Sequence, residues 1–174
     1  KDLKSETDVW LIFAPVKLFR MNIIIQKATE LGITRFVPCI TQYTNQPKIN
    51  IRNLKMNIVE ATEQSERLLI PSIDDPINLE NLIENFPKDR CLIFCNENRQ
   101  ALPMIYEALS QKIDQFKKWA ILIGPEGGFS KHEVEKIEAL TSTISVSLGE
   151  RILRSDTATT AAIFSLQSLV EYNK

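Results

Sequence analysis

Two glycine-bearing segments near the C-terminus carry the residue types best suited to chemistry. The first, at 124–128, reads Gly-Pro-Glu-Gly-Gly, and the second, at 148–154, reads Leu-Gly-Glu-Arg-Ile-Leu-Arg. Each follows a short apolar run typical of a strand and precedes a run with helical spacing. Loops that follow the strands of an open α/β sheet meet at its carboxyl edge, where such folds bind ligands. The two segments therefore predict one ligand cleft.

The first segment favours a cationic or hydrogen-bond-donating ligand. Glycines let a backbone approach a ligand closely, and a helix that begins just after them favours an anion such as phosphate. However, the chain shows neither the Gly-Lys-Ser/Thr of a P-loop nor the Gly-x-Gly-x-x-Gly of a dinucleotide site here. Glu126, in the middle of the segment, is poor chemistry for phosphate. A tight turn between a strand and a helix, with no ligand, is the alternative interpretation.

The second segment has apolar residues where a loop normally has polar ones. Ile152 and Leu153 lie between two arginines, Arg151 and Arg154. Because connecting loops usually run over the surface, this pattern indicates that the segment packs inward or lines an apolar pocket. Its backbone N–H and C=O groups could then recognise the edge of an aromatic heterocycle. The alternative for the two arginines is ordinary solvated charge.

A third polar cluster lies on a helix predicted over 51–69, stopped before Pro71. Glu60, Gln64 and Arg67 are spaced i, i+4 and i+7, so this helix would place them on one face. A solvated face with one intrahelical pair is the alternative. The cysteines Cys39, Cys91 and Cys95 are predicted to be buried small hydrophobes rather than disulfide partners.

Histidine chemistry is poorly supported. The single histidine, His132, leaves a metal site short of ligands and makes a Ser-His-Asp or Cys-His mechanism improbable.

The elements that would position these residues alternate along the chain. Strands are predicted over 9–13, 35–40, 90–94, 119–123 and 142–148, with helices over 20–31, 51–69, 78–86, 101–116 and 157–172 and another from Ser130. Such alternation predicts an α/β fold, with a mostly parallel sheet of five to six strands and helices on both faces. Residues 73–76 are predicted to form a turn, and 41–50 an irregular segment.

Individual residues mark several element ends. Gly32 is placed as a helix C-cap, and Pro38 is expected to put its strand at a sheet edge or a bulge. Ser130, with glutamate three residues later, predicts a capping box. Ser155 or Asp156 is expected to cap the last helix.

Length and composition bound the class of protein. The chain has 174 residues, of which 44% are hydrophobic and 25% charged, values typical of one globular domain. The formal net charge of −1 gives no global sign of nucleic-acid binding. No apolar run approaches membrane-spanning length. Residues 1–8 are polar and unlike a signal peptide, so we expect them to be the end of a linker and the true N-terminus to lie upstream.

Four motifs in order carry a family resemblance. They are 26–32 (Gln-Lys-Ala-Thr-Glu-Leu-Gly), 60–67 (Glu-Ala-Thr-Glu-Gln-Ser-Glu-Arg) and the two glycine-bearing segments. Together they resemble the RsmE family, bacterial 16S rRNA (uracil-N3)-methyltransferases of the SPOUT superfamily. The resemblance implies a SPOUT methyltransferase domain over 9–174 with a C-terminal trefoil knot. It also implies an N-terminal PUA-like domain that this chain does not contain, with 1–8 as the end of the linker from it.

The resemblance further implies a site for S-adenosylmethionine between three walls. Its residues would be, on the first wall, Leu122, Gly124, Glu126, Gly127 and Gly128, and on the second, Leu148, Gly149, Ile152, Leu153 and Arg154. The third wall would include Phe94, Cys95 and Asn96. Arg67, Gln64 and Arg154 would act on the substrate side, and Glu126 would orient the cofactor amine or assist deprotonation.

The implied reaction suits this composition. A sulfonium methyl is already activated, so transfer to uracil N3 needs neither a metal nor a covalent nucleophile. The resemblance implies a cytoplasmic homodimer, with no membrane partner, acting on 16S rRNA in the small ribosomal subunit. Asp156 stands where many relatives have glutamate. Two alternatives remain open: a SPOUT RNA methyltransferase with a different target base, and a non-catalytic RNA- or nucleotide-binding α/β module.

Overall fold

One parallel sheet organises the chain. The computed structural model describes residues 6–45, 48–96 and 102–173. The sheet has the strand order β3-β2-β1-β6-β5-β7, with β4 also paired to β2, and the printed pairs are all parallel. The strands are β1 Asp8–Phe13, β2 Arg35–Ile40, β3 Ser72–Ile73, β4 Ile77–Asn78, β5 Arg90–Cys95, β6 Lys118–Ile123 and β7 Thr143–Val146.

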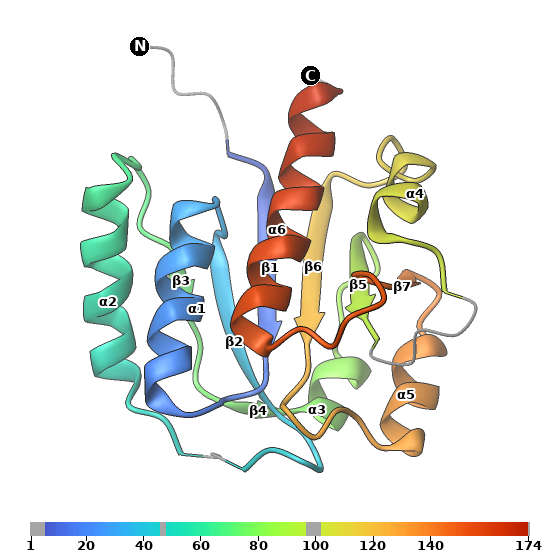
Figure 1. Cartoon of the computed structure of the whole chain (residues 1–174), viewed down its shortest axis with the longest axis horizontal. Helices are drawn as coiled ribbons and strands as arrows, with labels where there is room; N and C mark the ends of the chain where they lie inside the picture. The colour runs from blue at the N-terminus through green and yellow to red at the C-terminus, as the bar shows by residue number, and fades with distance from the viewer. Residues whose placement is uncertain (1–5, 46–47, 97–101, 174) are drawn as a thin grey trace.

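Helices cover both faces of this sheet (Figure 1). They are α1 Leu18–Glu30, α2 Ile51–Gln64, α3 Leu79–Glu84, α4 Ile105–Ser110, α5 Lys131–Glu138 and α6 Ser155–Tyr172. One core cluster joins the sheet to α1, α2, α4 and α6, and a second joins the other face to α3 and α5. The predicted α/β class, with a mostly parallel sheet and helices on both faces, is confirmed. None of the helices in the described ranges is long and apolar enough to cross a membrane.

Alternation along the strands divides their side chains between the two cores. In β6, Ile121 and Ile123 belong to the first cluster, whereas Ala120 and Leu122 belong to the second. Successive side chains of a strand point to opposite faces, so each central strand must be apolar along its whole length. This explains why these strands could be recognised as continuous apolar runs.

The predicted helix over 51–69 is too long. Helix α2 ends at Gln64, and Glu66 has a positive φ of 56°. The Ser65 hydroxyl donates to the Ala61 carbonyl at 2.7 Å, and the Arg67 amide donates to the Thr62 carbonyl at 3.1 Å. A local hydrogen-bonding serine and a left-handed residue end the helix well before Pro71. Arg67 therefore does not share a helix face with Glu60 and Gln64.

Two other predicted boundaries are also wrong. The helix predicted over 101–116 is a single short helix, α4, followed by turns, and residues 97–101 lie outside the described residues. The turn predicted over 73–76 lies between two short strands, β3 and β4, which both pair with β2. Their pairing is interrupted opposite Val37 and Pro38, where proline has no N–H to offer. Strand β2 is thus paired on both sides, with a gap in its outer pairing rather than a free edge.

The cap predictions had mixed outcomes. Gly32 follows the C-cap of α1 with φ 92°, and the capping box of Ser130 and Glu133 is complete, so both predictions are confirmed. The prediction for the last helix is wrong, because its N-cap is Arg154 and no side chain caps it. The trefoil knot stays a prediction, since the path from β5 to α4 includes residues 97–101, outside the described residues.

A cavity at the carboxyl edge of the sheet

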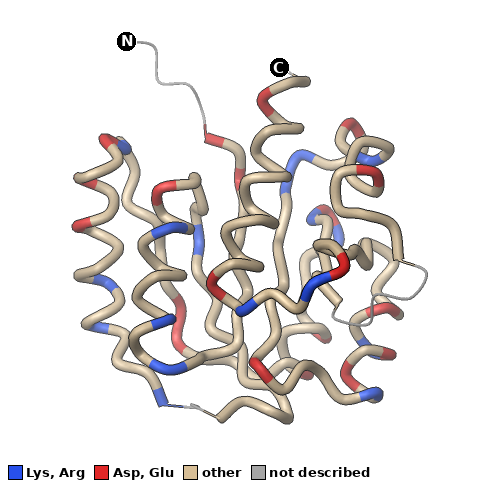
Figure 2. The backbone as a smooth tube through the Cα atoms, in the orientation of Figure 1, with Lys and Arg blue, Asp and Glu red and all other residues tan. Residues whose placement is uncertain are grey.

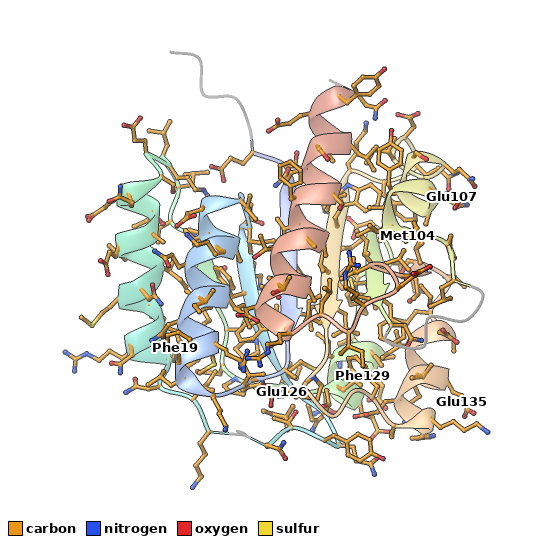
Figure 3. All side chains as sticks on the ribbon, viewed as in Figure 1. Phe19, Met104, Glu107, Glu126, Phe129 and Glu135 are labelled. Carbon is orange, nitrogen blue, oxygen red and sulfur yellow. The ribbon has the colours of Figure 1, made fainter. Side chains whose placement is uncertain are left out.

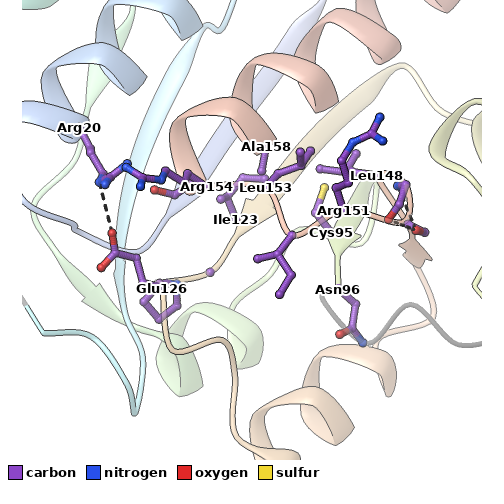
Figure 4. A pocket seen from close by; sticks show the side chains of 16 residues that line it. Arg20, Cys95, Asn96, Ile123, Glu126, Leu148, Arg151, Leu153, Arg154 and Ala158 are labelled. Carbon is purple, nitrogen blue, oxygen red and sulfur yellow. Dashed lines mark hydrogen bonds and ion pairs between the residues drawn. The ribbon is translucent and has the colours of Figure 1, made fainter.

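A cavity of about 310 Å³ lies at the carboxyl ends of β5 and β6 (Figure 4). Its walls come from the residues that follow β5, β6 and β7, from the first turns of α6 and from α1. The lining residues are Arg20, Cys95, Asn96, Ile123, Gly124, Pro125, Glu126, Ser147, Leu148, Gly149, Arg151, Ile152, Leu153, Arg154, Ser155 and Ala158. The two glycine-bearing segments therefore meet in one cleft, as predicted from their sequence.

Strand alternation decides which residues of β5 and β6 reach this cavity. Phe94 and Leu122 are register partners, and both point into the second core, where they are fully buried. Phe94 packs edge-on against Phe129, with ring centroids 5.2 Å apart. The next residues, Cys95 and Ile123, line the cavity instead. The side chains of Phe94 and Leu122, both predicted as cofactor-binding residues, thus lie behind the cavity wall.

The first glycine-bearing segment contributes half of its predicted residues to the wall. Gly124 and Glu126 line the cavity, whereas Gly127 and Gly128 form the turn behind it. The Gly128 amide donates to the Pro125 carbonyl at 2.9 Å, and Gly128 has φ 68°. A Cβ on Gly124 would lie 2.5 Å from the Phe129 ring. Glycine at 124 is therefore required for the ring to pack beneath the cavity floor.

The second segment lines the cavity along its length. The predicted residues Leu148, Gly149, Ile152, Leu153 and Arg154 are all on the wall. Gly149 has φ 115°, and its amide donates to the Ser147 hydroxyl at 3.2 Å, which turns the chain into the cavity. Ile152 remains 81% exposed, so the segment presents apolar surface at the mouth as well as inside. This arrangement agrees with the pocket-lining interpretation of its apolar residues.

Arg20, in the first turn of α1, is the charged lining residue that sequence reasoning missed. Its Nε lies 3.3 Å from a Glu126 carboxylate oxygen, and its Nη1 lies 3.8 Å from Asp156 Oδ1. Figure 4 shows the Arg20–Glu126 pair spanning one side of the cavity, with Arg154 next to it. Arg20 follows β1, which neighbours β6 in the sheet. Position after a strand was the available signal, but the strand order was needed to use it.

The start of α6 offers polar groups without partners. Ser155 lines the cavity and is 8% exposed, yet its hydroxyl has no hydrogen-bond partner among the described residues. Helix α6 has 18 residues and no side-chain cap, so its first amides also need acceptors. Beside them, burial raises the pKa of the Cys95 thiol to about 12, so this wall residue is neutral at physiological pH. A ligand with an apolar body and a polar end fits such a lining.

Two predicted substrate-side residues lie away from this cavity. The Arg67 guanidinium donates to the carbonyls of Thr29 and Ile33, at 2.8 and 2.9 Å, and pairs with Glu6. These partners flank the end of α1 and the starts of β1 and β2, which is the amino edge of the sheet. Gln64 lines a separate groove between α1 and α2. Of the three predicted catalytic residues, Arg154 alone is on the cavity wall.

Cysteines and metal ligands need only a short account. Cys39, Cys91 and Cys95 are free and buried, as predicted. Within the described ranges, no group of three or more His, Cys, Asp or Glu side chains is placed to hold a metal ion.

A parallel α/β domain with a cofactor-sized cavity at its carboxyl edge defines the class of protein, and comparison with known proteins defines the family. Residues 3–167 match the family model described as an RNA methyltransferase domain. The chain therefore belongs to this RNA methyltransferase family. The family resemblance predicted from the four motifs is confirmed.

Individual relatives agree with this family. The chain is 33% identical to ribosomal RNA small subunit methyltransferase E of Rickettsia conorii, over 95% of the chain and 66% of that protein. It is 32% identical to the protein of the same name from Mesomycoplasma hyopneumoniae, over 97% of the chain and 71% of that protein. The chain thus spans about two thirds of the length of these curated relatives.

A solved structure extends the likeness to three dimensions. Ribosomal RNA small subunit methyltransferase E from Neisseria gonorrhoeae, bound to S-adenosyl methionine, matches with a TM-score of 0.76 and 25% identity. The match covers 97% of this chain and 70% of that one.

Proposed function

We propose that this chain is the catalytic domain of an enzyme that transfers a methyl group from S-adenosylmethionine to N3 of a uridine in 16S rRNA. One observation carries the proposal: the two glycine-bearing segments and the start of α6 enclose a single cavity, with arginine side chains in its lining. Its volume of about 310 Å³ is at the lower end of small-molecule sites. The relatives named above are ribosomal RNA methyltransferases, which makes small-subunit rRNA the matching substrate.

The lining residues fit the cofactor by their chemistry. Ile123, Leu148 and Leu153 supply apolar wall for an adenine ring, whose edge backbone amides and carbonyls would recognise. The unpartnered Ser155 hydroxyl and the first amides of α6 would hold a polar end of the molecule. The half-exposed Glu126 carboxylate would accept from its amine. When bound, the cofactor supplies an activated sulfonium methyl.

The substrate side needs positive charge near the target base. Uracil N3 loses its proton during methylation, so negative charge develops on the base carbonyls, and preorganised donors stabilise such charge. Arg154 at the cavity wall would donate to the base or to an adjacent phosphate. Positioning the methyl in line with N3 would contribute several kcal/mol to lowering the barrier.

The assembly proposed for this activity is a homodimer in the cytoplasm, where ribosomal subunits occur. Support comes from exposed apolar side chains near the cavity mouth and on α6. Ile152 is 81% exposed and Phe164 is 62% exposed. Light scattering on the wild type and on Phe164→Glu tests this assembly, and a wild type that stays monomeric at all concentrations would contradict it.

The test of the proposed activity has two measurements. Calorimetry should show that S-adenosylhomocysteine binds the folded protein, and tritium from labelled S-adenosylmethionine should enter small subunits isolated from a strain that lacks this methyltransferase. Nucleoside mass spectrometry of the product should show 3-methyluridine. Binding without tritium transfer would indicate a non-catalytic module, and another methylated nucleoside would indicate a different target base. A folded sample that does not bind S-adenosylhomocysteine would refute the proposal.

A further inference from the structure

We propose that the groove between α1 and α2 binds single-stranded RNA next to the target nucleotide, an inference that rests on the proposed function. The groove has a volume of about 680 Å³ and is distinct from the cavity, since the two share none of their lining residues. It begins where the cavity ends: Leu18 and Phe19 line the groove, and Arg20, the next residue, lines the cavity. RNA that enters the cavity with one nucleotide can therefore continue into the groove.

The groove is lined by carboxamide side chains. Five of its lining residues carry them: Asn22, Gln26, Asn53, Asn57 and Gln64. An amide offers both a donor and an acceptor, which is the chemistry that recognises the edges of unpaired bases. Among the described lining residues, Glu60 alone carries a charge. The interior of the groove therefore suits bases rather than phosphates.

Large apolar side chains stand exposed at the entrance. Phe19 is 77% exposed, Met56 is 64% exposed and Leu18 is 54% exposed. Figure 3 shows Phe19 at the start of α1, on the side that faces α2. An exposed aromatic ring offers a face on which a base can stack, and such stacking tolerates any base.

Charge is divided along the groove in the direction that RNA requires. The exposed cations Lys17, Lys48, Arg52 and Lys55 lie at or just before the first turns of α1 and α2. Acidic residues, among them Glu60, Glu63 and Glu66, gather in and after the last turns of α2, as Figure 2 shows by colour. Helix N-termini add partial positive charge to the basic end. Phosphates would bind there, beside the cavity, and would be repelled from the far end.

This division of charge also limits how far the RNA reaches. The near half of the groove, with Phe19, Asn22, Asn53 and Met56, would hold one or two bases. The far half, with Glu60 and Gln64, would stay outside the phosphate track. Gln64, predicted as a substrate-side residue, would thus lie at the end of the RNA-binding surface rather than at the reacting base.

The experiment compares three variants in the intact protein. Arg52→Glu with Lys55→Glu reverses the charge of the basic end, and Phe19→Ala removes the stacking face. Lys112→Glu with Lys117→Glu makes the same charge change on exposed lysines beyond α4 and serves as the matched control. The probes are small subunits that lack the methyl group and a short single-stranded RNA that contains uridine. Circular dichroism and calorimetry with S-adenosylhomocysteine verify folding and the cavity.

The expected results separate charge from stacking. Reversal at Arg52 and Lys55 should weaken RNA binding about tenfold and reduce the slope of log affinity against log salt by about 1.4, since each phosphate contact to a single strand contributes about 0.7. Phe19→Ala should weaken binding about fivefold without changing the slope. The control should leave the slope within about 0.3 of the wild-type value, and S-adenosylhomocysteine affinity should be unchanged in all three.

Several outcomes would overturn this inference. RNA affinities equal to those of the control, or a wild type that binds cofactor but no RNA, would do so. A change of oligomeric state in Phe19→Ala without a change in RNA affinity per site would instead assign the groove to an interface between copies. Loss of cofactor binding in the wild type would be a failure of the proposed function, and the cofactor titration identifies that case separately.

Discussion

At the scale of single residues, Gly124 is the position where the cavity tolerates least. A Cβ there would lie 2.5 Å from Cε2 of Phe129, whose ring packs against Phe94 in the core below. We expect Gly124→Ala to displace the ring, destabilise the fold by about 1–3 kcal/mol and weaken S-adenosylhomocysteine binding about tenfold. Calorimetry on the folded variant measures the affinity.

Gly149→Ala is the matched comparison for this prediction. No atom lies within 4 Å of a Cβ at 149, but φ is 115°, so the cost is backbone strain of about 1–3 kcal/mol without a clash. The two variants separate a clash that pushes Phe129 from strain within the loop itself. Gly124→Ala with wild-type affinity would show that the Phe129 ring yields without moving the cavity wall.

At the scale of elements, Arg67 joins the ends of three of them. Its side chain is 7% exposed and connects the segment after α2 to the end of α1, to the start of β2 and to Glu6 before β1. A buried cation with these partners stabilises the amino edge of the sheet. We expect Arg67→Ala to lower the free energy of unfolding by roughly 3 kcal/mol while S-adenosylhomocysteine affinity at low temperature stays unchanged. Urea denaturation and calorimetry measure the two quantities.

Gln64→Ala provides the control for Arg67. Gln64 is exposed, in the last turn of α2, so its loss should cost less than about 0.5 kcal/mol. If Arg67→Ala kept full stability but lost methyl transfer, Arg67 would act on the substrate and the structural role would be refuted.

At the scale of the whole molecule, the two edges of the sheet have different tasks. The carboxyl edge holds the cavity, and the amino edge holds buried charge. Asp8 and Arg90, the first residues of β1 and β5, form an ion pair, and the Arg90 guanidinium lies 3.7 Å from the centre of the Trp10 ring. Burial alone would raise the pKa of Asp8, but its bond and charge interaction with Arg90 outweigh burial and hold that pKa below its ordinary value of 3.8.

This pair predicts a specific dependence of stability on pH. A carboxyl group with a depressed pKa in the folded protein stabilises it above the unfolded pKa, and the stabilisation is lost as pH falls through the folded pKa. We expect Asp8→Asn to be less stable than the wild type at pH 7, with the difference shrinking as pH falls below about 4. Urea midpoints across this pH range measure it. A difference that stays constant with pH would contradict the prediction.

Much of the local structure was predictable because it depends on neighbours in the chain. The buried strands were found from continuous apolar runs, and the capping box of Ser130 and Glu133 from two residue types at fixed spacing. The end of α2 was missed because Ser65 and Glu66 break a helix whose apolar pattern continues to Leu69. The side chains of Phe94 and Leu122 were assigned to the cavity because the face toward which a strand residue points depends on the packing of both cores.

The amino-acid sequence alone determined the family, the alternation of strands and helices, and the two segments that line the cavity, since these follow from residue types within short stretches. The tertiary structure alone decided that Arg20 would meet Glu126 and Asp156, because β1 packs beside β6 although more than a hundred residues separate them. It also placed Arg67 at the opposite edge from the cavity and left a groove between α1 and α2. Contacts between distant segments depend on which faces pack together, and no local pattern contains that information.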